Sequence, residues 1–244
     1  MKFDMCFPRE INKAKENNTP VVIVGGTVEY HGPHCSYGCD TLVAQGLVEK
    51  LAEKKDIIIA PTISYSPSSY AVGDEKSGTV HIPENAFEEY VYYVFMSMLN
   101  AGLKNIYVVI HHQFEQENLM PMTLSYMKAA KRAEMAYMEQ TRGRGWWGSE
   151  SFKNYYDELG SSDEPFSSIK VIHTMSKEEQ NATGYDHAGK YECSILMSLY
   201  PDAVKLDRID EIKHWFTESA REANKELGDI MVEKSLEWLD KRIV

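Results

Sequence analysis

Residues 20–40 read PVVIVGGTVEYHGPHCSYGCD, and this stretch decides the fold. It opens with Pro20 to Val24, a short and continuous apolar run of the kind that forms a fully buried strand. A Gly-Gly pair ends the run, and a polar loop rich in ionisable side chains extends from Thr27 to Asp40. Apolar residues then recur at helical spacing, so Asp40 is expected at the start of a helix, which its side chain could cap.

The same alternation of apolar runs and helical patterns continues along the chain. It predicts an α/β fold, a parallel sheet covered by helices on both faces, in one domain spanning residues 1–244. Further strands are expected at 57–60, 106–110 and 169–172, and further helices at 9–18, 84–100, 116–139, 186–199 and 210–243. Two polar stretches, 64–81 and 141–166, are longer than ordinary connections. The first is expected to be a functional or mobile loop, and the second a segment that covers another part of the protein.

The charge balance limits the partners of the chain. Its 26 Lys and Arg residues against 37 Asp and Glu residues give a net charge of −11, which disfavours nucleic acid and anionic membrane surfaces. No apolar run approaches the roughly 18 residues of a membrane span, and the N-terminus lacks the apolar core of a signal peptide. The four cysteines are too few and scattered for a disulfide scaffold, so a soluble cytoplasmic protein is expected.

The loop after the first strand carries ligand-type side chains. Glu29 and His31 project to the same side of an extended chain, and Asp40 returns to that region at the start of the next helix. Carboxylates with an imidazole form a mixed oxygen and nitrogen set suited to zinc, manganese or a similar ion. A carboxylate shared by two ions would suit a two-metal hydrolase, whereas the alternative is a solvated loop in which Asp40 only caps its helix.

A second cluster directly follows the predicted strand at 106–110. His111, His112, Gln113 and Glu115 leave the sheet there, and the carboxyl ends of parallel strands share one edge. Neighbouring histidines point to opposite sides of an extended chain, so at most one should reach a shared ion. The alternative is that one histidine caps the sheet edge and the other is solvated.

A third cluster, His187 and Glu192, lies near the start of the helix predicted at 186–199. With His187 in the preceding turn and Glu192 in the first turns, both side chains can face one pocket. The alternative is that they are ordinary capping and surface residues.

Three stretches that carry these clusters resemble the signatures of the creatininase family. Residues 25–40, GGTVEYHGPHCSYGCD, resemble the pattern G-x-x-E-x-H-G-x-H followed by a ligand Asp. Residues 108–116, VVIHHQFEQ, stand where the family has a strand followed by N-G-H-x-E-N or N-G-H-G-G-N. Residues 187–206, HAGKYECSILMSLYPDAVKL, match H-A-G-x-x-E-T-S-x-M-x-x-x-x-P closely. The resemblance covers roughly residues 10–207, with the motifs in the family's order.

The resemblance implies a three-layer α/β/α sandwich with a mostly parallel sheet, assembled as a homo-oligomer, usually a hexamer. It implies that His187 transfers protons at the scissile group. It also implies that Glu192 orients the attacking water or holds a ligand.

The resemblance further implies a divalent metal cofactor, with two ions of zinc or manganese, or also magnesium, in each chain. Glu29 and Asp40 would hold one ion, and His31, Asp40 and Glu115 the other, with Asp40 bridging them.

The second motif departs from the family where a ligand is expected. Gln113 stands in place of the usual histidine, so either its amide oxygen binds a harder ion, or His112 takes its place, or that site is empty. Phe114 stands where creatininase has a tyrosine, and Thr183 and Gly184 replace aromatic and acidic residues before the active-site histidine. These replacements argue against creatinine itself as the substrate.

The sequence therefore predicts a metal-dependent hydrolase that opens a small polar cyclic metabolite with metal-activated water, foremost a cyclic amide. Phe114 and Trp147 are candidate substrate-binding residues. One alternative is ring-opening hydrolysis of a C–C bond in a keto-inositol, as in inositol catabolism. An alternative of another class is a non-catalytic, metal-binding oligomeric relative.

Overall fold

Four parallel strands form the central sheet of the protein. The structure is a computed structural model that describes residues 1–70, 73–74, 76–157 and 166–244. The strands are β1 (Val21–Gly25), β2 (Ile58–Ile59), β3 (Ile106–Ile110) and β4 (Ile169–His173), in the order β2-β1-β3-β4. Every residue of β1 and β3 is buried, as expected for apolar central strands that are covered on both faces. The predicted parallel α/β fold is confirmed.

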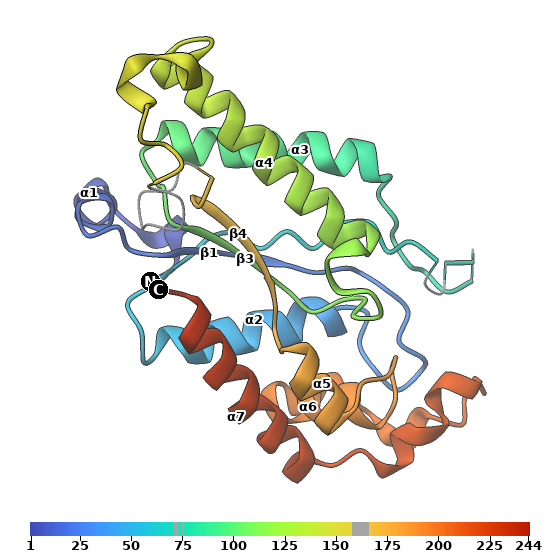
Figure 1. The fold of residues 1–244 in the computed structure, drawn as a ribbon. Helices are drawn as coiled ribbons and strands as arrows, with labels where there is room; N and C mark the ends of the chain where they lie inside the picture. The colour runs from blue at the N-terminus through green and yellow to red at the C-terminus, as the bar shows by residue number, and fades with distance from the viewer. Residues whose placement is uncertain (71–72, 75, 158–165) are drawn as a thin grey trace.

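Helices cover both faces of this sheet (Figure 1). α2 (Cys39–Ala52), α6 (Lys190–Leu199) and α7 (Lys225–Arg242) pack on one face. α1 (Pro8–Glu16), α3 (Glu84–Asn100) and α4 (Pro121–Arg142) pack on the other. The side chains of β1 alternate between the two layers, with Val22 and Val24 facing the first and Val21 and Ile23 the second. The three-layer α/β/α sandwich is therefore also confirmed.

The C-terminal region is not the single helix predicted at 210–243. A 3₁₀ helix, η7 (Trp215–Glu222), comes first, and the chain is extended at Ala223 before α7 begins. Asn224 is the N-cap that precedes α7, and its side chain accepts a hydrogen bond from the backbone N–H of Leu227 at 2.9 Å. The apolar periodicity runs through this break because both segments bury one side against the same layer.

The helices around the third and fourth strands also begin later than predicted. α4 starts at Pro121, after the short turn η2 (Glu117–Leu119), and α6 starts at Lys190. A further helix, α5 (Lys177–Thr183), was not predicted because its sequence KEEQNAT has no apolar stripe. A capping box between Ser176 and Glu179 defines its start.

Irregular segments connect these elements. Short 3₁₀ turns are η1 (Phe3–Met5), η3 (Trp146–Gly148), η4 (Glu150–Phe152), η5 (Pro201–Ala203) and η6 (Leu206–Arg208). Parts of the two long polar stretches, namely 71–72 and 75 in the first and 158–165 in the second, lie outside the described residues. None of the described helices has the length and apolar character needed to cross a membrane.

β1 is the point where the strand order changes direction. β2 pairs with it on one side and β3 on the other. In open α/β sheets, ligands bind outside the carboxyl ends of the strands at such a point. Gly25 at the end of β1 pairs with Ile110 at the end of β3, so the segments that follow leave the sheet side by side.

Gly26 allows the start of α2 to approach the end of β1. A Cβ atom on Gly26 would lie 2.6 Å from the Cα of Thr41, closer than side chains tolerate. The residue preceding α2 is Gly38, and no side chain caps the helix there, so the prediction that Asp40 caps it is wrong. The Asp40 carboxylate instead accepts a hydrogen bond from Thr27 Oγ1 in the loop after β1.

We expect the substitution Gly26→Ala to destabilise the protein by roughly 1–3 kcal/mol, because β1 and α2 would have to separate to admit the methyl group. Thermal unfolding measures this as a fall of about 2–4 °C in Tm for each kcal/mol. Gly38→Ala is the control, because a Cβ there would only touch Leu42 at 3.6 Å. Equal melting temperatures for the two variants would contradict this account of the contact.

Candidate metal centre

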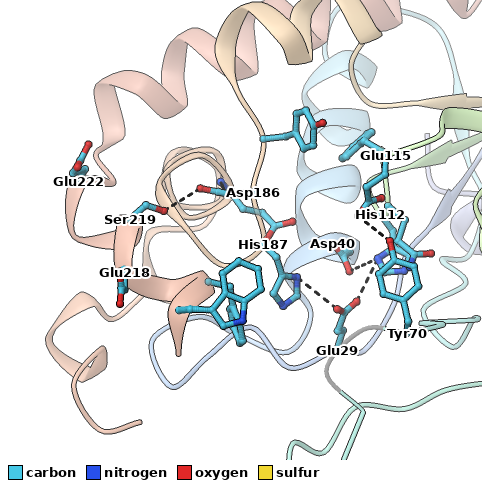
Figure 2. A pocket seen from close by; sticks show the side chains of 16 residues that line it. Glu29, Asp40, Tyr70, His112, Glu115, Asp186, His187, Glu218, Ser219 and Glu222 are labelled. Atoms are coloured by element: carbon cyan, nitrogen blue, oxygen red, sulfur yellow. Dashed lines mark hydrogen bonds and ion pairs between the residues drawn. The ribbon is translucent and has the colours of Figure 1, made fainter. Parts of the chain in front are cut away.

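A cleft of about 920 Å³ opens at the carboxyl ends of β1 and β3. Figure 2 shows Glu29, Asp40 and His112 together, with His187 beside them. Tyr70 and Glu115 lie on one side of this group, and Glu218, Ser219 and Glu222 of η7 lie on the other. The cleft therefore coincides with the edge of the sheet where the strand order predicts a ligand site.

Elements far apart in the sequence supply the cluster at this cleft. Glu29 and His31 belong to the loop after β1, and Asp40 to the first turn of α2. His112 follows β3, and Glu192 lies in the first turn of α6. All five side chains are buried.

Glu29, Asp40 and His112 form a first group of potential ligands. His112 Nδ1 lies 3.3 Å from Glu29 Oε2 and 3.2 Å from Asp40 Oδ2. One ligand atom from each residue lies within 4.8 Å of the others, so a single ion could contact all three.

The other oxygen of Asp40 faces a second group. His31 Nε2 lies 3.7 Å from Asp40 Oδ1 and 3.3 Å from Glu192 Oε2. Glu192 also shares ligand groups with His31 and His187, and with Asp40 and His111. The two oxygens of the Asp40 carboxylate therefore face different groups of potential ligands.

Backbone carbonyl groups orient two of the imidazoles. His31 Nδ1 lies 3.0 Å from the carbonyl oxygen of Glu29, and His187 Nε2 lies 2.9 Å from that of Tyr30. A carbonyl only accepts, so each of these nitrogens carries the proton. His31 Nε2 and His187 Nδ1 are therefore left with a lone pair, which is how metal-binding histidines are commonly fixed.

Burial and crowding shift the protonation of the cluster. Burial raises the pKa of Glu29 to about 7, and the neighbouring Asp40 carboxylate adds to this rise. Burial alone would lower the pKa of His31, but the carboxylates of Glu192 and Asp40 raise it well above its ordinary value. Burial likewise opposes ionisation of Asp40, whereas His112 and His31 hold its pKa below the usual range. The buried carboxylates thus depend on nearby positive charge.

The donor set fits divalent cations. Glu29, Asp40 and Glu192 converge, yet no Lys or Arg is among the described residues that line the cleft. Nε2 of His31, which faces Asp40 and Glu192, is buried and makes no hydrogen bond within the described structure. Carboxylate oxygens and imidazole nitrogens are the ligands that zinc and manganese prefer, and an ion would supply the positive charge.

The structure brings most of the predicted site residues together and leaves Glu115 outside them. The Glu115 side chain is exposed at the rim, where its Oε1 accepts a hydrogen bond from the Tyr70 hydroxyl at 3.0 Å. Gln113 has a φ of 52°, so the chain turns directly after His112 and carries Glu115 away from Asp40. Glu192 takes the position beside Asp40 and His31 that the family resemblance assigned to Glu115.

Of the three alternatives at the second motif, the geometry favours His112. It joins the first ligand group, whereas both polar atoms of the Gln113 amide are buried without a hydrogen bond. His111 was not expected to reach the cluster together with His112, but its Nε2 lies 3.8 Å from Glu192 Oε1. Both neighbours can border the cluster because they face different groups on either side of Asp40.

The two candidate substrate-binding residues separate in space. Phe114 lines the cleft, where its ring packs 5.1 Å from that of His111. Trp147 lies in η3, packs against Tyr155 and Tyr156, and is not among the residues that line the cleft. Trp215 and Phe216 line the cleft instead. They were not predicted as site residues because they fit the apolar pattern of the helix predicted at 210–243.

Known protein families and solved structures include relatives of this chain. A family model described as "Creatininase: Creatinine amidohydrolase" matches residues 6–241. The chain belongs to the creatininase family. The architecture also matches a solved structure titled "Creatininase Mn", with a TM-score of 0.72 at 16% identity over 99% of this chain and 98% of that one.

Two curated creatininase relatives carry different activities in their names. Creatinine amidohydrolase of Pseudomonas putida is 23% identical over 191 residues, which are 75% of this chain and 65% of that protein. The 3-dehydro-scyllo-inosose hydrolase of Thermotoga maritima is 29% identical over 123 residues, 50% of this chain and 38% of that protein. The chain thus matches less than two thirds of the length of either relative.

The family membership and the ligand groups together support a divalent metal at this site. The related structure is named for manganese, and the groups around Asp40 present suitable oxygen and nitrogen donors.

We expect Asp40→Ala to remove nearly all bound metal, because Asp40 belongs to ligand groups on both sides of the cluster. Elemental analysis of protein purified without chelator measures this, and at least one divalent ion per chain is expected before the change. Full metal occupancy in the variant would contradict the bridging arrangement.

Glu192 and Glu115 allow a matched comparison. Glu192→Gln should lower the metal content by about one ion per chain, because it removes a charged ligand beside His31. Glu115→Gln should leave the metal content unchanged, because Glu115 pairs with Tyr70 at the rim. The reverse result would restore Glu115 as the ligand.

Proposed function

We propose that this protein is a metal-dependent hydrolase that opens a small polar ring by adding water to a ring carbonyl. The observation that carries the proposal is the Asp40 carboxylate, whose two oxygens face separate ligand groups at the floor of a cleft. Such a site suits hydrolysis because a bound divalent ion lowers the pKa of a water ligand and polarises a carbonyl oxygen.

The residues of the chain divide into two sets of ligands in this proposal. Glu29, Asp40 and His112 would hold one ion. His31, Asp40 and Glu192 would hold the other, with zinc or manganese as the candidates.

His187 is proposed to move the proton. Its Nε2 donates to the carbonyl of Tyr30, so Nδ1 carries the lone pair and lies 3.6 Å from Glu29 Oε1. Burial is the largest of the causes that lower the pKa of His187. The imidazole is therefore neutral at neutral pH, ready to accept a proton from the attacking water and to return it to the leaving group.

Two substrate classes follow from the two named relatives. Cyclic amides, in which a C–N bond breaks, are proposed first because the matching family model is described by an amidohydrolase activity. A keto-inositol, in which a C–C bond breaks, is the second because the inosose hydrolase shares 29% identity over 123 residues. Incubating the manganese-loaded protein with both classes and measuring ring-opened product distinguishes them.

A non-catalytic metal-binding relative is the alternative of another class. Glu29, His31, Asp40, Glu115, His187 and Glu192 all match the family motifs, which supports an enzyme because a decaying site would lose several of these residues together. Assembly as a homo-oligomer of several chains is also proposed, and light scattering tests it against the 27.9 kDa of one chain.

We expect His187→Ala to lower kcat at least about a hundredfold on the substrate identified, because it removes the proposed general acid and base. Metal content and the thermal unfolding temperature should stay near those of the unchanged protein. Retained turnover would show that His187 is only structural, and loss of metal would make it a ligand.

A further inference from the structure

The cleft carries an indole that the proposed hydrolytic chemistry does not use. Trp215 begins η7, lines the cleft and leaves 85% of its surface exposed. Large aromatic side chains gain from being covered, and their faces bind flat or ring-shaped groups. An exposed indole at the mouth of a ligand cleft is therefore positioned to receive a ring.

A chain of aromatic contacts runs from this indole to the cluster. The ring of Trp215 meets that of Phe216 edge to face at 5.8 Å, and Phe216 lies 5.2 Å from His187. Phe216 also stacks on His214 at 4.7 Å, and His214 Nε2 lies 3.1 Å from the Tyr30 hydroxyl. Tyr30 stands between Glu29 and His31 in the sequence. The contacts of Phe216 and His214 therefore reach the loop that carries these potential ligands.

The side chains around the indole set a charge requirement. Glu115, Asp186, Glu218 and Glu222 line the cleft outside the ligand groups, and no Lys or Arg is among the described lining residues. In Figure 2, Glu218 and Glu222 lie along η7, across the cleft from Glu115. An anionic group entering here would meet carboxylates on both walls.

Two ammonium groups lie near these carboxylates, and one of them offsets Glu222, which leaves Glu115, Asp186 and Glu218 without a Lys or Arg partner among the described residues. Lys190 Nζ pairs with Glu222 at 2.9 Å, and Lys177 Nζ donates to the carbonyl of Phe114 at 3.1 Å.

We infer that Trp215 is the ring-stacking, specificity-determining residue of this site, and that the acidic rim restricts its ligands to uncharged or positively charged rings. The inference rests on the proposed function and deepens it by naming the charge class of the substrate.

A matched set of lactams tests this in the manganese-loaded protein. Pyrrolidin-2-one is neutral, 3-aminopyrrolidin-2-one carries a positive charge, and 5-oxoproline carries a negative charge. Ligand-observed NMR measures their dissociation constants. We expect the neutral and cationic lactams to bind, and the anionic one to bind at least about tenfold more weakly.

The indole is tested by substitution. Trp215→Ala should weaken binding of the neutral and cationic lactams about tenfold, and Trp215→Phe should recover most of the loss. Metal content should not change. Tyr93→Ala is the control, because Tyr93 is an aromatic residue of α3 that is 61% exposed and does not line the cleft.

The inference fails if no lactam binds, if the anionic lactam binds as well as the others, or if Trp215→Ala leaves the dissociation constants within twofold. It also fails if Trp215→Ala changes the mass of the assembly, because Trp215 would then be a contact between copies. These constants do not depend on turnover. A protein that binds the lactams through Trp215 but hydrolyses no ring would overturn the proposed function alone.

Discussion

The buried carboxylate of Asp40 is the constraint on which the rest of this site depends. It is 2% exposed and lies between His31 and His112, with its two oxygens facing different partners. An ionised carboxylate in such a place is costly unless compensating groups surround it, so the loop after β1, the end of β3 and the start of α6 must converge. The bare backbone of Gly26 permits that convergence by letting α2 reach the end of β1.

The fold could be predicted where local signals and burial agree. The bounds of α3 match the prediction because Pro83 precedes its start and Gly102 closely follows its end. β1 and β3 were found because their apolar runs are unbroken. The break before α7 was missed because the apolar stripe continues through it, and the side-chain cap of Asn224 is a weak local signal beside that stripe.

The candidate site could be predicted less completely. A motif gives the residue types within one segment, but the neighbours of those residues in space come from distant segments. The spacing of Glu29 and His31 after the first apolar run predicted both residues at the carboxyl end of β1, and the structure has them in the loop there. Which carboxylate accompanies His31 depends on the left-handed turn at Gln113 and on where α6 docks on the sheet. Neither can be read from a motif, so family spacing indicated Glu115 where the geometry favours Glu192.

The helices offset part of the cost of burying this charge. Asp40 and Glu192 both lie in the first turn of a helix, where the N-terminal end of the dipole favours a negative group by about 0.3–2 kcal/mol. Desolvation of a buried ion costs several kcal/mol, so the dipoles alone do not suffice. Imidazoles supply part of the remainder, yet burial, with the neighbouring Asp40 carboxylate, still raises the pKa of Glu29 to about 7. A divalent cation held by these carboxylates would add the missing positive charge, and its binding would then be coupled to the stability of the loop between β1 and α2.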